Sequence, residues 1–155
     1  MKLVAADEDD VDTLRRFWYA LAADMEQYSD LNALAYDGES EVPEDGFREL
    51  LGSDDVTVLL LREADEPVGF VTLREGRHPS REYSHYVEIV DLFVKAERRG
   101  RGLGTEAIER VKEMARERGC DHLTVTFERG NEGARRLYAD RGFEEKRITS
   151  VCRLD

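Results

Sequence analysis

The sequence is poor in lysine, in cysteine and in long apolar runs, and each shortage excludes a class of protein. Its 155 residues include four lysines, so most of the basic residues are arginine. The two cysteines, Cys120 and Cys152, form no CxxC pair and have no metal-ligand spacing, so we expect two small thiols and no metal cofactor. No apolar run approaches the roughly 20 residues that cross a bilayer, and MKLVAADEDD contains no charged-then-apolar signal segment. We therefore expect one cytoplasmic domain, residues 1–155, with no membrane partner.

Positive charge is also in short supply. Asp and Glu total 35 against 23 Lys and Arg, which gives a formal net charge of −12. Sequence-independent binding of nucleic acid needs a net positive surface, so we expect no nucleic-acid partner. An acidic, lysine-poor surface repels itself in dilute buffer, and salt screens that repulsion. We therefore hypothesise a salt-adapted protein from a halophilic organism.

The apolar pattern predicts a mixed α/β (α+β) fold. Apolar runs predict strands at residues 2–6, 56–61, 68–73, 83–94, 122–127 and 143–154. Helical spacing, capping residues and terminal glycines predict helices from residue 10, after Pro43, at residues 103–119 and at residues 131–142. The run 83–94 is nearly all apolar or β-branched, which is typical of a buried central strand. Because a helix separates it from the strand at 122–127, we expect these two strands to be parallel.

The most informative stretch is ERRGRGLGTEAIERV, residues 97–111, which joins a predicted strand to a predicted helix. Gly100, Gly102 and Gly104 alternate along it. The basic residues that surround these glycines are Lys95, Arg98, Arg99 and Arg101. A helix N-terminus presents unpaired amides and a partial positive charge, glycines let the backbone approach an anion, and arginines add donors. The pattern therefore predicts a site for the phosphates of a cofactor.

Two common phosphate-binding motifs are absent. The chain contains no GxxxxGK[ST] sequence, which the phosphate loop of kinases and ATPases requires. A dinucleotide fingerprint needs GxGxxG, whereas this turn reads GxGxG. Glu128 follows the next predicted strand, as an acidic residue does in that motif, but too few elements remain after it to build a dinucleotide-binding fold.

Two segments match a pair of family signatures in the correct order. RGRGLG, residues 99–104, matches the pattern Arg/Gln-x-x-Gly-x-Gly/Ala, and NEGARRLYADRGF, residues 131–143, matches N-x-x-A-x-x-L-Y-x-x-x-G-F. With one helix and one strand between them, they resemble the GNAT superfamily of acetyl-CoA-dependent N-acetyltransferases over residues 83–143. The resemblance implies a mixed, mostly antiparallel sheet that is flanked by helices and splayed at the acetyl-CoA site.

The resemblance also implies roles for particular residues. The cofactor-binding turn would consist of Arg99, Gly100, Arg101, Gly102, Leu103, Gly104 and Thr105, with the amides of residues 101–105 on the pyrophosphate. The backbone of Leu92, Phe93 and Val94 would pair with the pantetheine arm as an added strand does. Asn131 would contact the cofactor where the strands splay, and Tyr138 would lie near the thioester sulfur. The remaining phosphate of coenzyme A would meet Lys95, Arg98 or Arg99.

Acetyl transfer to an amine needs a base, a donor to the oxyanion and an acid for the leaving thiolate. Tyr138 is the candidate acid, because a tyrosine hydroxyl has a pKa of about 10. A backbone amide that a β-bulge leaves unpaired can donate a hydrogen bond to the oxyanion. Glu88 and Asp91 lie inside an apolar strand, where burial raises a carboxylate's pKa and makes it a better base. Glu88 is our candidate base, with Asp91 or ordered water as alternatives. Because Glu88 and Asp91 are three positions apart, we expect the two carboxylates to face opposite sides of a regular strand.

The reaction expected from the resemblance is transfer of an acetyl group from acetyl-CoA to a primary amine. Candidate acceptors are a small metabolite, an amino-sugar, a polyamine, and a protein N-terminus or lysine. The alternative is a non-catalytic acyl-CoA-binding sensor, and the presence of Tyr138 favours the enzyme. A homodimer through the predicted strand at residues 143–154 would protect that strand's edge.

Overall fold

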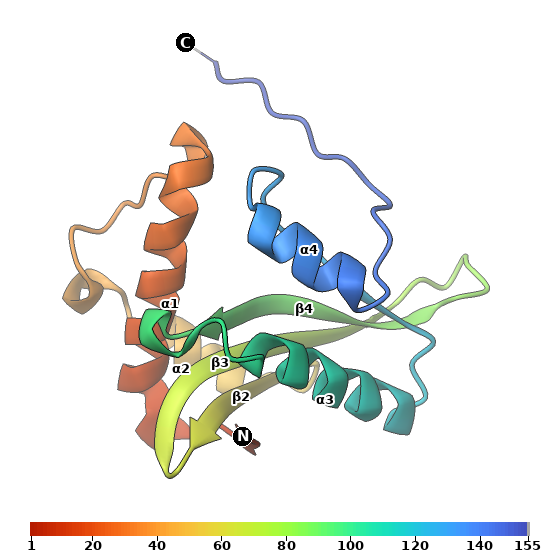
Figure 1. Cartoon of the computed structure of the whole chain (residues 1–155), viewed down its shortest axis with the longest axis horizontal. Helices are drawn as coiled ribbons and strands as arrows, with labels where there is room; N and C mark the ends of the chain where they lie inside the picture. The colour runs from red at the N-terminus through yellow and green to blue at the C-terminus, as the bar shows by residue number, and fades with distance from the viewer. Residues whose placement is uncertain (155) are drawn as a thin grey trace.

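The computed structural model describes residues 1–154, which form a sheet with helices on both faces (Figure 1). The strands are β1 (Lys2–Ala5), β2 (Val56–Glu63), β3 (Glu66–Arg77), β4 (His85–Val94) and β5 (His122–Val125). The helices are α1 (Val11–Met25), α2 (Asp45–Leu51), α3 (Leu103–Glu117) and α4 (Glu132–Asp140). The strands lie side by side in the order β1-β2-β3-β4-β5; β1 to β4 are antiparallel, and β5 is parallel to β4. The predicted mixed fold and the parallel crossover through α3 are therefore confirmed.

The sheet carries an apolar core on each face, because side chains alternate along its strands. In β2, Val58 and Leu60 pack with side chains of α1, whereas Leu59 and Leu61 pack with side chains of α3. Phe47 of α2 joins the first core, and Tyr138 of α4 joins the second. Thus α1 and α2 cover one face, and α3 and α4 cover the other (Figure 1).

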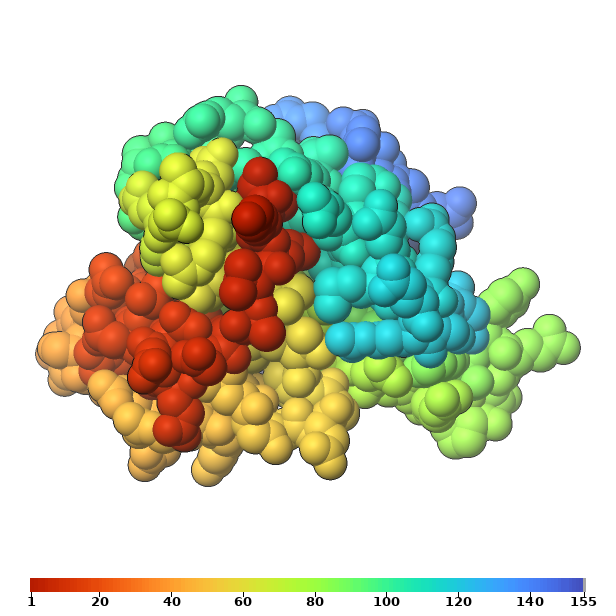
Figure 2. Space-filling view, turned by 90° about the horizontal axis from the view of Figure 1, so that it is seen from below, coloured from red at the N-terminus to blue at the C-terminus, as the bar shows by residue number. Residues whose placement is uncertain are grey.

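The helix ends follow the local sequence signals. The side chain of Asn131 accepts a hydrogen bond of 3.0 Å from the amide of Ala134, as expected for an N-cap. Gly119 and Gly142 follow α3 and α4 with φ of 77° and 92°, a left-handed conformation that favours glycine after a helix. None of the helices within residues 1–154 is long and apolar enough to cross a membrane. The loop of residues 78–84, between β3 and β4, projects from the body (light green, right of Figure 2).

A β-bulge in β4 overturns one expectation from the sequence. Thr72 pairs with Asp91 but Leu73 pairs with Ile89, so Val90 is an extra residue in β4. Further along, Arg74 pairs with Glu88. Thr72 and Arg74 are two positions apart in β3 and share a face, so their partners Asp91 and Glu88 also share one face. The expectation that these carboxylates face opposite sides is therefore wrong, because it assumed a regular strand.

The expectation of a last strand at residues 143–154 is also wrong. This segment runs past α4 and away from the sheet (blue, top of Figure 1), and it forms no strand. Its apolar side chains are exposed: Ile148 by 90%, Val151 by 69% and Leu154 by 89%. A β-strand needs a neighbouring strand to accept its backbone hydrogen bonds, and within residues 1–154 this segment has none. A strand-like composition was therefore not sufficient to form a strand at residues 143–154.

Candidate active site

A cleft opens between β4 and β5 because the two strands pair over only part of their length. β5 pairs with Tyr86 to Ile89, whereas β3 pairs with β4 as far as Val94. Among the described strands, none pairs with the outer edge of β4 beyond Ile89. A cavity of about 270 Å³, the cleft cavity, lies there and is lined by residues of α1, β4, α4 and the segment that follows β5. The edge at Leu92, Phe93 and Val94 is thus open to an extended ligand.

The glycine turn lies between the end of β4 and the start of α3, as expected. Gly100 and Gly102 have φ of 77° and 81°, which only glycine adopts readily, and a Cβ atom added at either would meet nothing within 4 Å. A Cβ atom at Gly104 would lie 3.5 Å from Leu137, an ordinary contact. In the part of the chain described, no side chain caps α3 at Gly102. The first amides of α3 thus have no capping side chain at Gly102, as at a helix N-terminus that binds an anion.

The basic side chains of the turn are paired with carboxylates, so the turn is not an isolated positive patch. The ion pairs with carboxylates outside the turn are Lys95–Glu66 at 3.3 Å, Arg98–Glu63 at 3.1 Å, Arg98–Glu66 at 2.7 Å, Arg99–Asp24 at 3.0 Å and Arg101–Glu63 at 3.7 Å. Arg99 also donates from Nε to the carbonyl oxygen of Val94 at 2.8 Å, which fixes the turn to the end of β4. Arg101 has the longest of these pairs, and its side chain is 55% exposed.

Tyr138 and Asn131 both line the cleft cavity, as the second signature implies. Tyr138 is 6% exposed. Its ring stacks on Phe127 with centroids 5.4 Å apart and meets Phe143 edge-on at 5.2 Å. Burial raises the pKa of Tyr138 to about 12, so its hydroxyl stays protonated at physiological pH. Asn131 uses its side-chain oxygen to cap α4, which leaves its amide group for other contacts.

A second cavity of about 400 Å³, the apolar cavity, lies between α1, α2 and the sheet. Its lining is mostly apolar and includes the aromatic side chains of Trp18, Tyr36, Phe47 and Phe70. Its polar lining residues are Thr72, Arg74 and Asp91. The two cavities share Trp18, Val90 and Asp91. The cavities therefore meet at the bulge residue Val90, the Asp91 carboxylate and the Trp18 indole.

The structure separates the two candidate bases by position. Asp91 lines both cavities, whereas Glu88 is partly buried on the same face and lines neither. Burial raises the pKa of the Asp91 carboxyl, the hydrogen bond from Thr72 and the charge of Arg74 lower it, and the charge of Glu88 raises it again. Asp91 is thus a partly desolvated carboxylate at the junction of the cavities.

Some residues of the site carried no sequence signal for it. The helical spacing of Trp18 predicts a core anchor, yet its side chain is only partly buried and lines both cavities. Tyr36 lies in the least periodic part of the sequence and meets Trp18 edge-on at 6.5 Å. The loop that contains Tyr36 contributes to the apolar cavity, as loops on a fixed scaffold often carry binding residues.

A sheet that splays beside a glycine-rich helix N-terminus, with a second cavity meeting the cleft at a carboxylate, can hold two ligands side by side. Residues 17–143 match the family described as Acetyltransferase (GNAT) family. The chain therefore belongs to the GNAT acetyltransferase family. This match spans both the glycine turn and Tyr138.

Relatives and solved structures agree with this assignment. An uncharacterized N-acetyltransferase of Archaeoglobus fulgidus is 33% identical over 139 residues, which cover 90% of each chain. A thialysine N-epsilon-acetyltransferase of Bos taurus is 27% identical over 129 residues, covering 81% of this chain and 75% of the bovine one. The crystal structure of a tetramutant of the BH1408 protein from Bacillus halodurans superposes with a TM-score of 0.86 at 21% identity, over 99% of this chain and all of that one, and shows the shared fold. The chain is thus an N-acetyltransferase, and these relatives do not identify its acceptor.

Proposed function

We propose that the protein transfers the acetyl group of acetyl-CoA to the primary amine of a substrate with an apolar body. The observation that carries this proposal is the meeting of the two cavities at Trp18, Val90 and Asp91. A cofactor that occupies the cleft cavity would bring its thioester to this junction, and an amine in the apolar cavity would reach it from the other side. The reacting atoms would then be held together, which accounts for a large part of the rate of a two-substrate reaction.

The residues of the cleft fit acetyl-CoA. The amides of residues 101–105 would bind its pyrophosphate, since the turn at Gly100 and Gly102 leaves open space before the free end of α3. The open edge of β4 at residues 92–94 would pair with the pantetheine arm. Asn131 would donate its amide group to the same arm. Arg101 is the best placed of the basic residues to meet the remaining phosphate, because its side chain is the most exposed of the four, at 55%.

The lining of the apolar cavity favours an ammonium group on an aromatic or aliphatic body. Trp18, Tyr36 and Phe47 would contact the body, and Asp91 would attract the ammonium. An amino-sugar would bring more hydroxyls than the three polar lining residues Thr72, Arg74 and Asp91 would pair with, and burying the rest costs free energy. The bovine relative is named for an N-epsilon-acetyl transfer to thialysine, an amine at the end of an aliphatic thioether chain. The thioether chain of that acceptor would fit the apolar lining, and its terminal ammonium would face Asp91.

The chemistry can be assigned to four groups of this chain. Asp91 would remove a proton from the acceptor's ammonium, a task for which its raised pKa suits it. Glu88 would support this step by raising that pKa further, or would relay the proton outward through water. The backbone opened by the bulge at Val90 would donate to the developing oxyanion. Tyr138 would protonate the departing thiolate, since its hydroxyl stays protonated in its buried place. Acetyl-CoA itself supplies the activated acyl group.

The test is acetyl-CoA-dependent thiol release against matched amines in high-salt buffer. The panel pairs arylalkylamines, lysine and thialysine with a polyamine, an amino-sugar and peptides with free N-termini. We expect the largest kcat/KM for amines on apolar bodies. Turnover confined to the amino-sugar or the polyamine would refute the proposed acceptor while leaving acetyl transfer intact. Silence across the whole panel, together with tight acetyl-CoA binding, would count against the acceptor class and the catalytic roles alike.

We also propose a salt-adapted, cytoplasmic protein that forms a homodimer. The net charge of −12 supports salt adaptation, because screening would relieve repulsion between the excess carboxylates. The exposed Ile148, Val151 and Leu154 support the dimer, since a second copy would cover them. Light scattering on the full chain and on a variant with these three residues changed to serine tests the dimer. Equal masses for the two proteins would refute this interface.

A further inference from the structure

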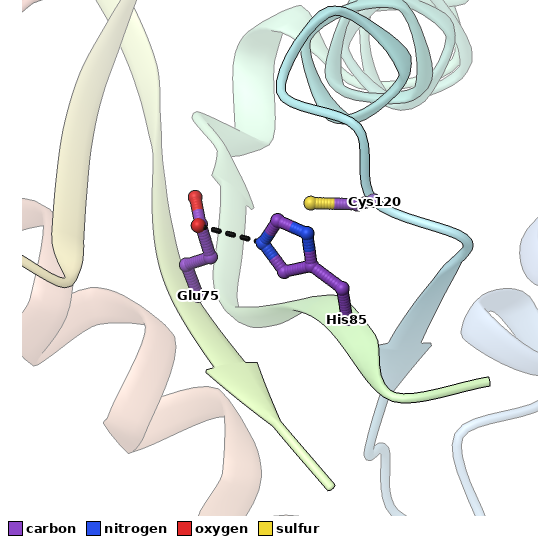
Figure 3. Close-up of side chains that lie close together, drawn as sticks. All are labelled: Glu75, His85 and Cys120. Atoms are coloured by element: carbon purple, nitrogen blue, oxygen red, sulfur yellow. Dashed lines mark hydrogen bonds and ion pairs between the residues drawn. The ribbon is translucent and has the colours of Figure 1, made fainter. Parts of the chain in front are cut away.

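A second cluster of chemistry-bearing side chains lies at the end of the sheet away from the cleft. Glu75 belongs to β3, His85 begins β4, and Cys120 follows α3 in the turn before β5. One ligand atom from each, a carboxylate oxygen, a ring nitrogen and the sulfur, all lie within 4.8 Å of one another. Figure 3 shows the Glu75 carboxylate and the Cys120 sulfur on either side of the His85 ring. The three residues come from three separate elements, which is why the sequence did not reveal them.

Backbone contacts hold this cluster in place. The amide of His85 donates to Oδ2 of Asp121 at 3.1 Å, and the amide of Asp121 donates to the carbonyl oxygen of His85 at 2.8 Å. The amide of Cys120 donates to the carbonyl oxygen of Ala115 at the end of α3, at 2.9 Å. The main chain at His85 and Cys120 is therefore held by hydrogen bonds that do not involve the side chains of these two residues.

The Glu75 carboxylate divides its two oxygens between two partners. Oε2 lies 2.7 Å from Nε2 of His85, and Oε1 lies 3.6 Å from Nη1 of Arg118. Arg118 is itself held by a hydrogen bond of 3.1 Å from Nη2 to the hydroxyl of Thr57. The arginine thus orients the carboxylate so that Oε2 is directed at His85, as the outer partners of metal ligands do.

Cys120 does not have the surroundings of a reactive thiol. Activated cysteines sit beside positive charge, which lowers the pKa of the thiol. Here burial and the charge of Glu75 raise the pKa of the Cys120 thiol. The sulfur is therefore not an activated nucleophile, and it has to lose its proton before it can bind a metal.

We propose that Glu75, His85 and Cys120 bind Zn²⁺, with water as the fourth ligand. Zinc accepts sulfur, imidazole nitrogen and carboxylate oxygen together, in a tetrahedral arrangement. Ligand atoms around such an ion are roughly 3.3 to 3.6 Å apart, so binding requires the 2.7 Å contact between Glu75 and His85 to open and the ligand atoms, now within 4.8 Å of one another, to converge on the ion. The thiol gives its proton to solvent on binding, and the thiolate and the Glu75 carboxylate balance the two positive charges of the ion.

The proposed ion has a structural role. It joins β3, β4 and the turn between α3 and β5, at the end of β4 remote from Val90 and Asp91. It therefore goes beyond the acetyltransferase activity, and it replaces the expectation from the sequence that the protein holds no metal. Because an ion that binds only the folded state stabilises it, a hundredfold excess of Zn²⁺ over its Kd is expected to raise the Tm by about 5 to 10 °C.

The test uses Co²⁺ as a spectroscopic probe for Zn²⁺ on the purified full chain. A thiolate ligand gives cobalt a near-ultraviolet sulfur-to-metal charge-transfer band. We expect this band at one Co²⁺ per chain, displaced by Zn²⁺, lost in Cys120→Ser and kept in Cys152→Ser, the matched control for the other cysteine. Glu75→Gln is expected to keep the band but to weaken Zn²⁺ binding by more than about tenfold, a loss that even outer partners of metal ligands produce.

Three outcomes would overturn the proposal. They are the absence of a band with the wild-type chain, a band that survives Cys120→Ser, and a band that disappears with Cys152→Ser. Circular dichroism of each variant without metal shows whether it folds. If Cys120→Ser does not fold, Glu75→Gln and His85→Asn take its place, and unchanged Zn²⁺ affinity in both would refute the site.

Discussion

Replacement of Tyr138 by phenylalanine removes one hydroxyl from the cleft and little else. The ring keeps its contacts with Phe127 and Phe143, whose centroids lie 5.4 and 5.2 Å away. The free energy of unfolding should change by no more than about 1 kcal/mol, the net value of a typical hydrogen bond, which corresponds to a Tm shift of at most about 4 °C. Turnover should fall by roughly 100-fold or more, because a positioned acid contributes at least that much.

The pH dependence gives this prediction a second, independent readout. With a pKa of about 12, only about one Tyr138 hydroxyl in 10,000 is ionised at pH 8. The wild-type kcat should therefore show no alkaline decline from this residue over the accessible range. A decline near pH 10 would mean that the hydroxyl is not desolvated as the structure indicates.

The assay is steady-state thiol release together with acetyl-CoA affinity by calorimetry. The matched control is Tyr83→Phe, since Tyr83 is 72% exposed in the loop before β4. We expect a lower kcat and a nearly unchanged acetyl-CoA Kd for Tyr138→Phe alone. An unchanged kcat would refute the acid role, and an equal loss of cofactor affinity would make Tyr138 a binding residue instead.

Three further predictions follow. Asp91→Asn should lower kcat without lowering the Tm at neutral pH. Folding raises the pKa of Asp91, so the ionised carboxylate destabilises the folded state at every pH above the unfolded pKa, and its removal costs no stability there. A lower Tm for this variant would contradict the reasoning. Gly102→Ala should lower the free energy of unfolding by about 1 to 2 kcal/mol, because φ there is 81°, and should weaken acetyl-CoA binding. The control Gly38→Ala should change neither quantity, and equal effects of the two substitutions would refute the role of the turn. The Tm should rise between dilute and molar KCl, and a flat or falling Tm would exclude salt adaptation.

Local chemistry alone determined much of this protein. The glycines at positions 100 and 102, the N-cap at Asn131 and the alternation of apolar residues in β2 act within a few residues of chain, so their consequences can be predicted from the sequence. The two signatures likewise predicted the turn and placed Tyr138 in the cleft, because each is a contiguous segment with a fixed local conformation.

The tertiary structure decided what depends on distant partners. The pairing of β3 with β4 creates the bulge at Val90, which brings Glu88 and Asp91 to one face and puts Asp91 at the junction of the two cavities. The apparent last strand finds no strand beside it and so does not form. The side chains of Glu75, His85 and Cys120 meet because strand register and the end of α3 bring together positions far apart in the chain. None of these outcomes follows from residues near in sequence, since each depends on which backbone lies alongside.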